Sequence, residues 1–506
     1  MFDAFIDGLF LVLQWHAFFY LIFGVAIGFW VGLLPGIGGS STMALMIPFI
    51  HTMSPVEAIA FLLGMHAAAN NAGDITSILF GIPGEATSVA VMIDGHPMAK
   101  KGEAGRAMGA SLSSSLAGGV IGAIFLALSI PLVRPLVLAL GSPEMFMVIV
   151  LGITCISSLS SRGYRGLLLG LIAGGMGILC SMVGQDRQMG ILRYTFNQPY
   201  LWNGFPIIPV VIGFFAIPEI IDLAVRGTSI AGDLPHGQLR KGVWEGVKDT
   251  LRNFGLLVRC SIIGIIVGIL PGIGGGVSQW IGYAHARQSV KTIEEKDGFG
   301  KGDVRGVIGP GSATNSKEGA ALIPTVAFGI PGSIGMAILL GAFLLKGIAP
   351  GPDMLRKELP LVFSMVWTII VANILITVVC IFFVNHIAKL THIRGNFIIP
   401  LIIPLCFLGA FAAKQHMGDL ITVMIFGAVG YFMVRFDYPH PPFIVGFILG
   451  GIAESYLYIS TTRYRAEWLY QPKVIFIFLL AVFVAFYPTI QEKRMLKKKK
   501  GQENEG

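Results

Sequence analysis

The chain has 506 residues, of which 54% are hydrophobic and only 13% are charged. This composition, with a mean hydropathy of +0.75, excludes an ordinary soluble globular protein and places the chain in a lipid bilayer. The net charge of +8 predicts no nucleic-acid partner, because the run KRMLKKKK at 493–500 supplies much of it and is typical of a cytoplasmic segment that faces anionic lipid.

Long apolar windows recur along the chain. They lie at 18–34, 116–132, 146–156, 167–182, 207–224, 256–270, 361–384, 397–412, 420–434, 443–458 and 474–487. Several approach the roughly 20 residues that a helix needs to cross the hydrocarbon core, so about 10–12 spans are expected. The windows lack the alternation of outer-membrane strands, and backbone groups in lipid must be satisfied within the chain. The sequence therefore predicts an all-α polytopic membrane protein.

The first interruption is GLLPGIGGSS at 32–41, which follows an apolar window directly. Proline removes a backbone donor and glycine tolerates positive φ, so a helix should stop here. In a bilayer such a break survives only where it lines a wet cavity or is buried against protein. If a helix restarts, its free N–H groups and its dipole attract a carboxylate. The residues expected to bind substrate here are Gly36, Gly38, Gly39, Ser40 and Ser41.

A second interruption, FGIPG at 80–84, follows the polar stretch NNAGDITS at 70–77. The residues near this break that we expect to bind substrate are Asn70, Asn71, Thr87 and Ser88. A carboxylate among apolar spans is costly and faces a cavity, a partner or an ion. Asp74, with amide oxygens and freed carbonyls nearby, has the hard-oxygen character that suits Na⁺, or it forms a proton site if buried. As an alternative, Asp74 only caps a helix.

The second half repeats both interruptions. ILPGIGG at 269–275 contributes Gly272, Gly274 and Gly275, and the segment 313–333 contributes Asn315, Lys317, Glu318, Gly332 and Ser333. We expect Glu318, like Asp74, to hold the coupling cation, and the other residues to bind substrate. Lys317 either meets a substrate carboxylate or simply neutralises Glu318.

Three motifs therefore occur twice in the same order, as in many secondary transporters. They are LLPGIGG at 33–39 and ILPGIGG at 269–275, FGIPG at 80–84 and 328–332, and PVVIGFFAIPE at 209–219 with its echo PFIVGFILGGIAE at 442–454. The predicted units are a first transmembrane repeat at 1–225, a cytoplasmic linker at 226–255, a second transmembrane repeat at 256–460, a final transmembrane helix at 461–490 and a basic cytoplasmic tail at 491–506.

Basic residues indicate which loops lie in the cytoplasm. They place there the linker, through Arg226, Arg240, Lys241, Lys248 and Arg252, and the loop after the first FGIPG, through Lys100, Lys101 and Arg106. The counterpart of that loop, PGPDMLRKELP at 350–360, balances basic with acidic residues. Corresponding loops thus lie on opposite sides, which favours inverted repeats. The N-terminus lacks the basic region of a cleavable signal peptide and is expected to stay in the mature protein.

The sequence predicts no cofactor. Five cysteines (Cys155, Cys180, Cys260, Cys380 and Cys406) are scattered without any Cys-x-x-Cys pair, which argues against a metal or disulfide framework. The stretches GIGGSS and GIGGG are not followed by the Gly-Lys-Ser/Thr of a nucleotide-binding loop.

The motifs GLLPGIGG, GDITSILFGIPG and NSKEGAALIPTVAFGIPG and the duplicated layout resemble the large membrane subunit of the tripartite tricarboxylate transporters, over residues 18–460. The resemblance implies a bacterial inner-membrane, ion-driven importer of citrate-like or other organic carboxylates that uses no ATP. It also implies two partners, a periplasmic solute-binding protein and a small membrane subunit of about four helices. The resemblance does not fix the substrate.

Two other functions remain open from the residues alone. A carboxylate channel would pass substrate down its gradient without a binding protein or a coupling ion. An intramembrane enzyme would use His66, Asp74 and Glu85 for acid–base chemistry, but it would need a nucleophile or a metal cluster that the sequence does not offer, and His66 fits a packed histidine better. The favoured function is therefore secondary transport, in which one half moves against the other by an elevator-like slide or by rocking.

Overall fold

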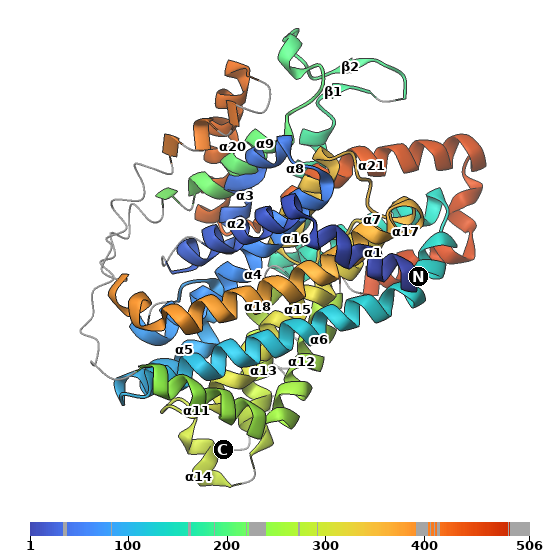
Figure 1. Cartoon of the computed structure of the whole chain (residues 1–506). Coiled ribbons are helices and arrows are strands. Elements are labelled where there is room, and N and C mark those ends of the chain that lie inside the picture. The colour runs from blue at the N-terminus through green and yellow to red at the C-terminus, as the bar shows by residue number, and fades with distance from the viewer. Residues whose placement is uncertain are drawn as a thin grey trace, which may run out of the picture.

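The structure is a computed structural model of the whole chain (Figure 1). It describes all residues except 34–37, 82, 160–162, 187, 219, 222–238, 272–273, 291, 391–402, 405, 409, 412–414, 484 and 486–506. Two of the predicted substrate-binding glycines, Gly36 and Gly272, lie outside the described residues, as do the basic tail and much of the predicted linker.

The fold is helical, as the sequence predicts. Among the described residues, five helices are long and apolar enough to span a membrane: Trp15–Gly32, Ala104–Leu138, Leu359–Phe383, Met417–Arg435 and His440–Tyr464. A sixth span results if Gly242–Arg252 and Phe254–Ile269, which are bent by 76° at their junction, are counted as one. This number is smaller than the ten to twelve spans expected, because several apolar windows form shorter helices, such as Ser142–Thr154 and Pro472–Phe483.

Two further long helices, α4 (Pro55–Phe80) and α15 (Arg305–Phe328), lie in the middle of the molecule (Figure 1). Residues 58–79 of α4 and Gly306 to Ala327 of α15 are buried. Surrounding helices shield these two from the membrane, so they can carry polar side chains that a lipid-facing helix excludes. Both end at a glycine in the left-handed conformation, Gly81 (φ 66°) and Gly329 (φ 68°), as the glycine of each FGIPG motif requires.

The two halves pack on each other in matched pairs. The outer helices of each half are α2 (Trp15–Gly32), which packs on α4, and α12 (Phe254–Ile269), which packs on α15. The longest helices cross over: α6 (Ala104–Leu138) packs along α15 of the other half, and α18 (Leu359–Leu390) packs along α4. The pairing recurs in both halves and fits the predicted duplication; the inverted relation of the halves stays a prediction.

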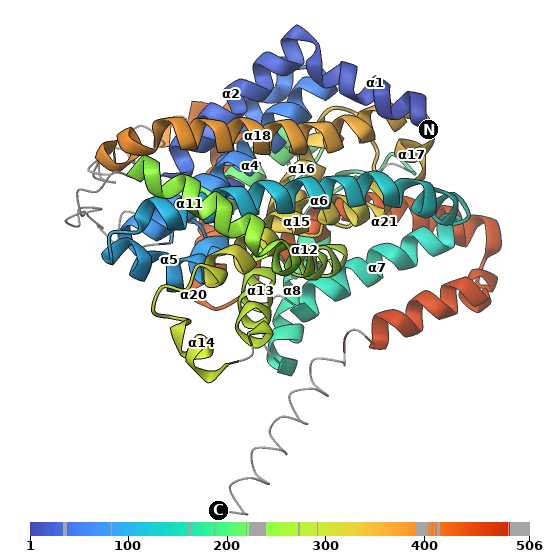
Figure 2. The same ribbon diagram turned by 60° about the horizontal axis from the view of Figure 1, so that its bottom comes forward.

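Two peripheral helices follow the same pattern. Helix α1 (Phe2–Leu13) packs on α18, and α11 (Leu239–Arg252) packs on α6 (Figure 2). The predicted linker therefore contains a helix that lies on the first half. Its position is fixed by Arg106, whose Nε donates to Oδ2 of Asp249 at 2.6 Å.

Short helices follow the four interruptions, and the remaining elements complete the outer layers. The short helices are α3 (Gly39–Met46), α5 (Val89–Lys100), α13 (Gly274–Ser289) and α16 (Ile334–Leu345). The outer elements are α7 (Ser142–Leu159), α8 (Gly163–Ser181), α9 (Ile207–Val211) with a π-helical turn at Ile212–Ala216, α14 (Ile293–Gly298), α17 (Pro352–Lys357), α20 (Met417–Arg435) and α21 (His440–Tyr464). Short 3₁₀ helices lie at Ile47–Thr52, Ala86–Ser88, Pro199–Leu201 and Glu467–Tyr470.

One small hairpin stands apart from the helices (Figure 1). Its strands, β1 (Gly184–Gln185) and β2 (Leu192–Arg193), pair antiparallel. The guanidinium of Arg193 forms a two-pronged ion pair with Glu454 of α21, with N–O distances of 2.7 and 3.0 Å. This pair ties the hairpin, which follows α8, to the second half.

Candidate functional site

Helix ends and new helix starts stand at all four predicted interruptions. Helix α2 ends at Gly32 and α3 starts at Gly39, and α12 ends at Ile269 and α13 starts at Gly274. The two FGIPG interruptions begin only where α4 ends at Phe80 and α15 ends at Phe328. The polar stretches before them lie within the continuous helices α4 and α15, so their side chains are positioned by regular helix rather than by broken backbone.

Three buried asparagines from three helices meet between the halves. Asn71 of α4 donates from Nδ2 to Oδ1 of Asn373 at 3.1 Å, and Asn315 of α15 donates from Nδ2 to Asn71 and Asn373, both at 3.3 Å. Asn373 belongs to α18 and rests on Gly119 of α6, where a Cβ would lie 2.8 Å from the amide nitrogen of Asn373. The predicted residues Asn71 and Asn315 are thus brought together, and Asn373 is a partner that the sequence analysis missed.

The two predicted cation-binding carboxylates have different surroundings. Asp74 accepts a hydrogen bond from Ser111 of α6 at 2.7 Å. Glu318 lies 2.5 Å from Nζ of Lys317 and 3.3 Å from Nε2 of His66. All these side chains are buried. Of the two roles considered for Lys317, the geometry displays the neutralising one, since the ion pair offsets part of the cost of burying each charge.

Some buried polar atoms near these groups have no hydrogen-bond partner among the described residues. They include both amide atoms of Asn70 and the hydroxyl of Thr314. Asn70 lies one helical turn after His66 on α4, and Thr314 lies one turn before Glu318 on α15, so each shares a helix face with that neighbour. Because buried polar groups in native proteins are normally hydrogen-bonded, an unpaired amide is a candidate contact for a ligand.

Starts of two short helices lie beside the same charged groups. The backbone N–H of Gly39, at the start of α3, donates to Oε1 of Glu85 at 3.0 Å. The His66 ring lies close to both helix starts. A Cβ on Gly39 would lie 3.3 Å from its Nδ1 atom. A Cβ on Gly335, at the start of α16, would lie 2.9 Å from its Cε1 atom. Ser333 caps α16 by accepting from the N–H of Met336. Two positive helix ends therefore converge on His66, one from each half.

The other predicted site residues contribute less to this cluster. Gly332 packs its backbone against Ala321, where a Cβ would lie 2.7 Å away. Ser40, Ser41 and Thr87 are half-buried, and the described part of the chain shows no side-chain hydrogen bond from them. Ser88 is buried beside Gly73, Gly38 lies near Glu85, and Gly274 and Gly275 begin α13. The predicted site residues that the structure describes therefore do not all touch one another.

Asn373 and Ser111 were missed for an understandable reason. Asn373 stands in the apolar stretch VANILI, and Ser111 is one of four serines in the stretch GASLSSS. An asparagine inside an otherwise apolar window is the signal that could have identified Asn373. His66, for which the sequence favours a packed histidine, contacts Glu318 directly.

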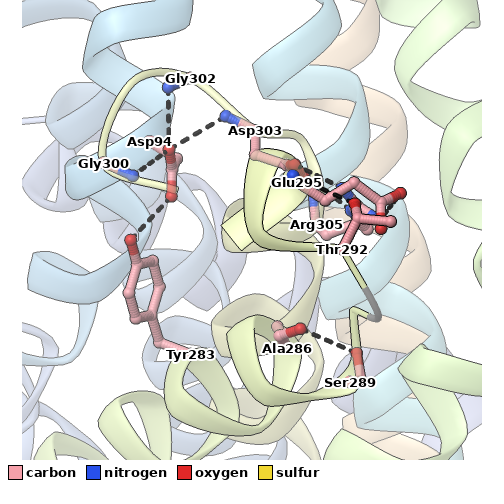
Figure 3. Close-up of polar contacts among 10 residues, drawn as sticks. All are labelled: Asp94, Tyr283, Ala286, Ser289, Thr292, Glu295, Gly300, Gly302, Asp303 and Arg305. Carbon is pink, nitrogen blue, oxygen red and sulfur yellow. Dashed lines mark hydrogen bonds and ion pairs between the residues drawn. The ribbon is translucent and has the colours of Figure 1, made fainter. Parts of the chain in front are cut away.

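A separate polar cluster joins the two halves next to these helices (Figure 3). Asp94 of α5 is buried and accepts from the N–H groups of Gly300, Gly302 and Asp303 at 2.8, 2.8 and 3.0 Å, and from the hydroxyl of Tyr283 of α13 at 2.9 Å. We call this arrangement the Asp94 clasp. It fastens the helix after one interruption of the first half to α13 and the loop before α15 of the second half.

A further cavity lies elsewhere in the fold. It has a volume of about 930 Å³ and is lined by the end of α8, the hairpin segment, the end of α16 and the middle of α21, including His51, Trp202, Leu345 and Ile448. Lys346, which follows α16, donates to the carbonyl oxygens of His51 and Met53 beside it. None of the residues of the His66 cluster lines this cavity.

The chain folds as a polytopic, helical membrane protein. Its helices pair, its breaks lie in matched positions, and a buried polar region lies between the two halves. The chain belongs to the Tripartite tricarboxylate transporter TctA family, whose sequence profile matches residues 18–445. That family is a family of transporter membrane subunits, which confirms the resemblance drawn from the motifs.

Two relatives, both from Agrobacterium vitis, are similar to this chain. The "Uncharacterized 52.8 kDa protein in TAR-I ttuC' 3'region" is 32% identical over 478 residues, which cover 93% of each chain. The "Uncharacterized protein in TAR-II ttuC' 3'region" is 27% identical over 237 residues, covering 46% of this chain and 97% of the relative. No solved structure matches the chain.

Proposed function

We propose that this chain is the translocation subunit of a cation-coupled secondary importer of tricarboxylates or related organic carboxylates. It works in the bacterial inner membrane with a periplasmic solute-binding protein and a small membrane subunit. The observation that carries the proposal is the meeting of two helix starts, of α3 and α16, on a buried region that holds the unpaired amide of Asn70. Free N–H groups and an unpaired amide suit a carboxylate.

The substrate carboxylates are held by the N–H groups at the starts of the short helices, with Asn70, Asn71 and Asn315 as polar neighbours. Asp74 or Glu318 holds the coupling cation, Na⁺ or H⁺, with nearby oxygen ligands. Because groups from both halves face this region, a movement of one half against the other would expose it to each side in turn.

Transport in proteoliposomes tests the proposal. The purified chain, with the small membrane subunit, is reconstituted and supplied with radiolabelled citrate under an imposed Na⁺ or H⁺ gradient, with and without the binding protein. The expected result is citrate accumulation above equilibrium that requires one gradient and the binding protein. Equilibration without either would indicate a channel, and chemical conversion of citrate or lipid without a gradient would indicate an enzyme. Either result would contradict the proposal.

A further inference from the structure

Glu85 occupies an unusual place for a glutamate in a membrane-embedded fold. It follows the first FGIPG interruption, and its carboxylate reaches across to a helix that begins 46 residues earlier, where Oε1 accepts from the N–H of Gly39 at 3.0 Å. The second oxygen, Oε2, is buried and has no hydrogen-bond partner among the described residues. Half of this carboxylate is therefore unused by the fold.

The Glu85 carboxylate lies at the positive end of a helix. The start of α3 supplies that end, and α3 has eight residues. The basic side chains of His66 and Lys317 lie in the same region, but both are paired with Glu318. The donor that Glu85 itself uses is therefore the backbone N–H of Gly39.

A second buried group points to a ligand in the same region. Asn70 has both amide atoms unpaired and lies one turn from His66 on the same face of α4. No atom of Glu85 forms a hydrogen bond with Asn70 among the described contacts. The fold thus provides a carboxylate position at the start of α3, which Glu85 fills, and, one turn from His66, a buried amide without a described partner.

A comparison within the chain separates this arrangement from ordinary capping. Glu144 of α7 also accepts from a glycine N–H, that of Gly141, at 2.9 Å. That contact spans three residues and closes a local turn at the start of its own helix, as capping carboxylates usually do. The Glu85 contact joins two separate interruptions and leaves one oxygen unpaired, so local capping does not account for it.

We infer that Glu85 is an internal occupant of a carboxylate subsite at the start of α3, and that a carboxylate of the substrate displaces it there. This inference rests on the proposed function. Two carboxylates cannot share one N–H donor at close range without strong like-charge repulsion. The side chain of glutamate can leave by rotation about its own bonds while the backbone stays in place. In the absence of substrate, Glu85 keeps the helix start satisfied.

Substrate binding to Glu85 variants tests the inference. The full chain is prepared with Glu85→Gln, Glu85→Ala and Glu85→Asp, and binding of radiolabelled citrate is measured in nanodiscs. We expect Glu85→Gln and Glu85→Ala to bind citrate about tenfold more tightly than the unsubstituted chain, because the competing charge is gone. Glu85→Asp keeps the charge but has a shorter reach, so a smaller increase is expected. The matched control is Glu144→Gln, which should bind citrate with unchanged affinity.

Each outcome decides between two interpretations. If the Glu85 variants bind citrate no more tightly than the unsubstituted chain while that chain transports citrate, Glu85 is a structural cap or a direct ligand and the displacement is wrong. If the uncharged variants do not fold, the citrate affinity of Glu85→Asp decides instead. Citrate binding by Glu85→Asp that is unchanged or weaker than that of the unsubstituted chain also overturns the inference. If neither the unsubstituted chain nor any variant binds citrate, the proposed function fails together with the subsite.

Discussion

At the residue scale, the cost of burying charged side chains determines which groups must pair. His66, Lys317 and Glu318 lie inside a bilayer protein, where an isolated charge is costly, and Glu318 contacts both of the others. Because Glu318 contacts both His66 and Lys317, removing any one of the three would leave a buried polar or charged group without its partner. Asn70 and Glu85 each keep hydrogen-bonding capacity that no described residue uses, and so does Nδ1 of His66. Of these groups, Asn70 is the one that the proposed function assigns to the substrate.

The asparagine cluster leads to a prediction about transport. We expect Asn71→Ala, Asn315→Ala and Asp74→Ala each to reduce citrate uptake in proteoliposomes to below about a tenth, because truncation leaves buried polar partners unpaired in the binding region. Membrane insertion, followed by the amount of purified protein, should stay intact. Asn253→Ala is the control, because among the described residues that side chain bonds to the Asp249 carbonyl of its own turn. Full uptake in all three variants would contradict the proposed site.

At the scale of the helices, backbones pack closely against each other at glycines. Helices α2 and α4 approach each other along Gly24, Gly28 and Gly32, and α12 approaches α15 at Gly264 and Gly268. Such small residues let helix backbones touch in a membrane, where association depends on van der Waals packing. The central helices that carry the polar residues are thus held at fixed distances by glycines rather than by large side chains.

A substitution at one of these glycines should separate two helices. A Cβ on Gly28 would lie 2.1 Å from the carbonyl oxygen of Met65, so Gly28→Ala must push α2 away from α4. We expect a loss of about 2 kcal/mol in unfolding free energy, measured as a lower unfolding temperature in detergent. Gly175→Ala in α8 is the matched control, because nothing lies within 4 Å of its Cβ. It should be neutral or stabilise the helix by up to about 1 kcal/mol.

The Asp94 clasp gives a second prediction at this scale. Asp94→Ala removes the acceptor of three backbone N–H groups and one hydroxyl, so we expect a loss of about 3 kcal/mol, since each buried unsatisfied donor costs 1 kcal/mol or more. Faster proteolysis of the 298–305 loop should accompany it. Asp353→Ala removes an exposed pair with Lys357 at 3.7 Å and should change stability by less than about 0.5 kcal/mol. Equal stability of both variants would show that the clasp contributes nothing.

The arrangement of the whole molecule follows from the longest helices. Helix α6 has 35 residues and is therefore about 52 Å long, more than the thickness of the hydrocarbon core. In both views α11 lies beside one end of it and α17 near the other (Figures 1 and 2). Residues of α11 and α17 should therefore face opposite sides of the membrane.

Cysteine labelling tests this sidedness. In a chain freed of its five cysteines, Arg252→Cys in α11 and Lys357→Cys in α17 replace side chains that are 77% and 67% exposed. We expect a membrane-impermeant maleimide to label Lys357→Cys in intact spheroplasts, but to label Arg252→Cys only after permeabilisation, because basic loops stay in the cytoplasm. Labelling of both from the same side would contradict the predicted topology and, with it, the inverted repeats.

The sequence by itself determined the helical membrane class, the positions of the four interruptions and the polar residues near them. These features depend on local chemistry: apolar length for a span, proline and glycine for a break, and the cost of a polar group in lipid. The family followed from the same motifs, because LPGIGG and FGIPG in duplicate are specific strings. No long-range geometry was needed for any of these conclusions.

Only the tertiary structure decided which of those residues meet. The crossing of α6 and α18 into the opposite halves brings Ser111 to Asp74 and Asn373 to Asn71, and spacing along the chain does not encode that crossing. The structure also placed Glu85 at the start of α3, where the sequence analysis expected a substrate carboxylate. Contacts between residues distant in sequence depend on how helices pack, and packing is set by the whole set of surfaces rather than by any one motif.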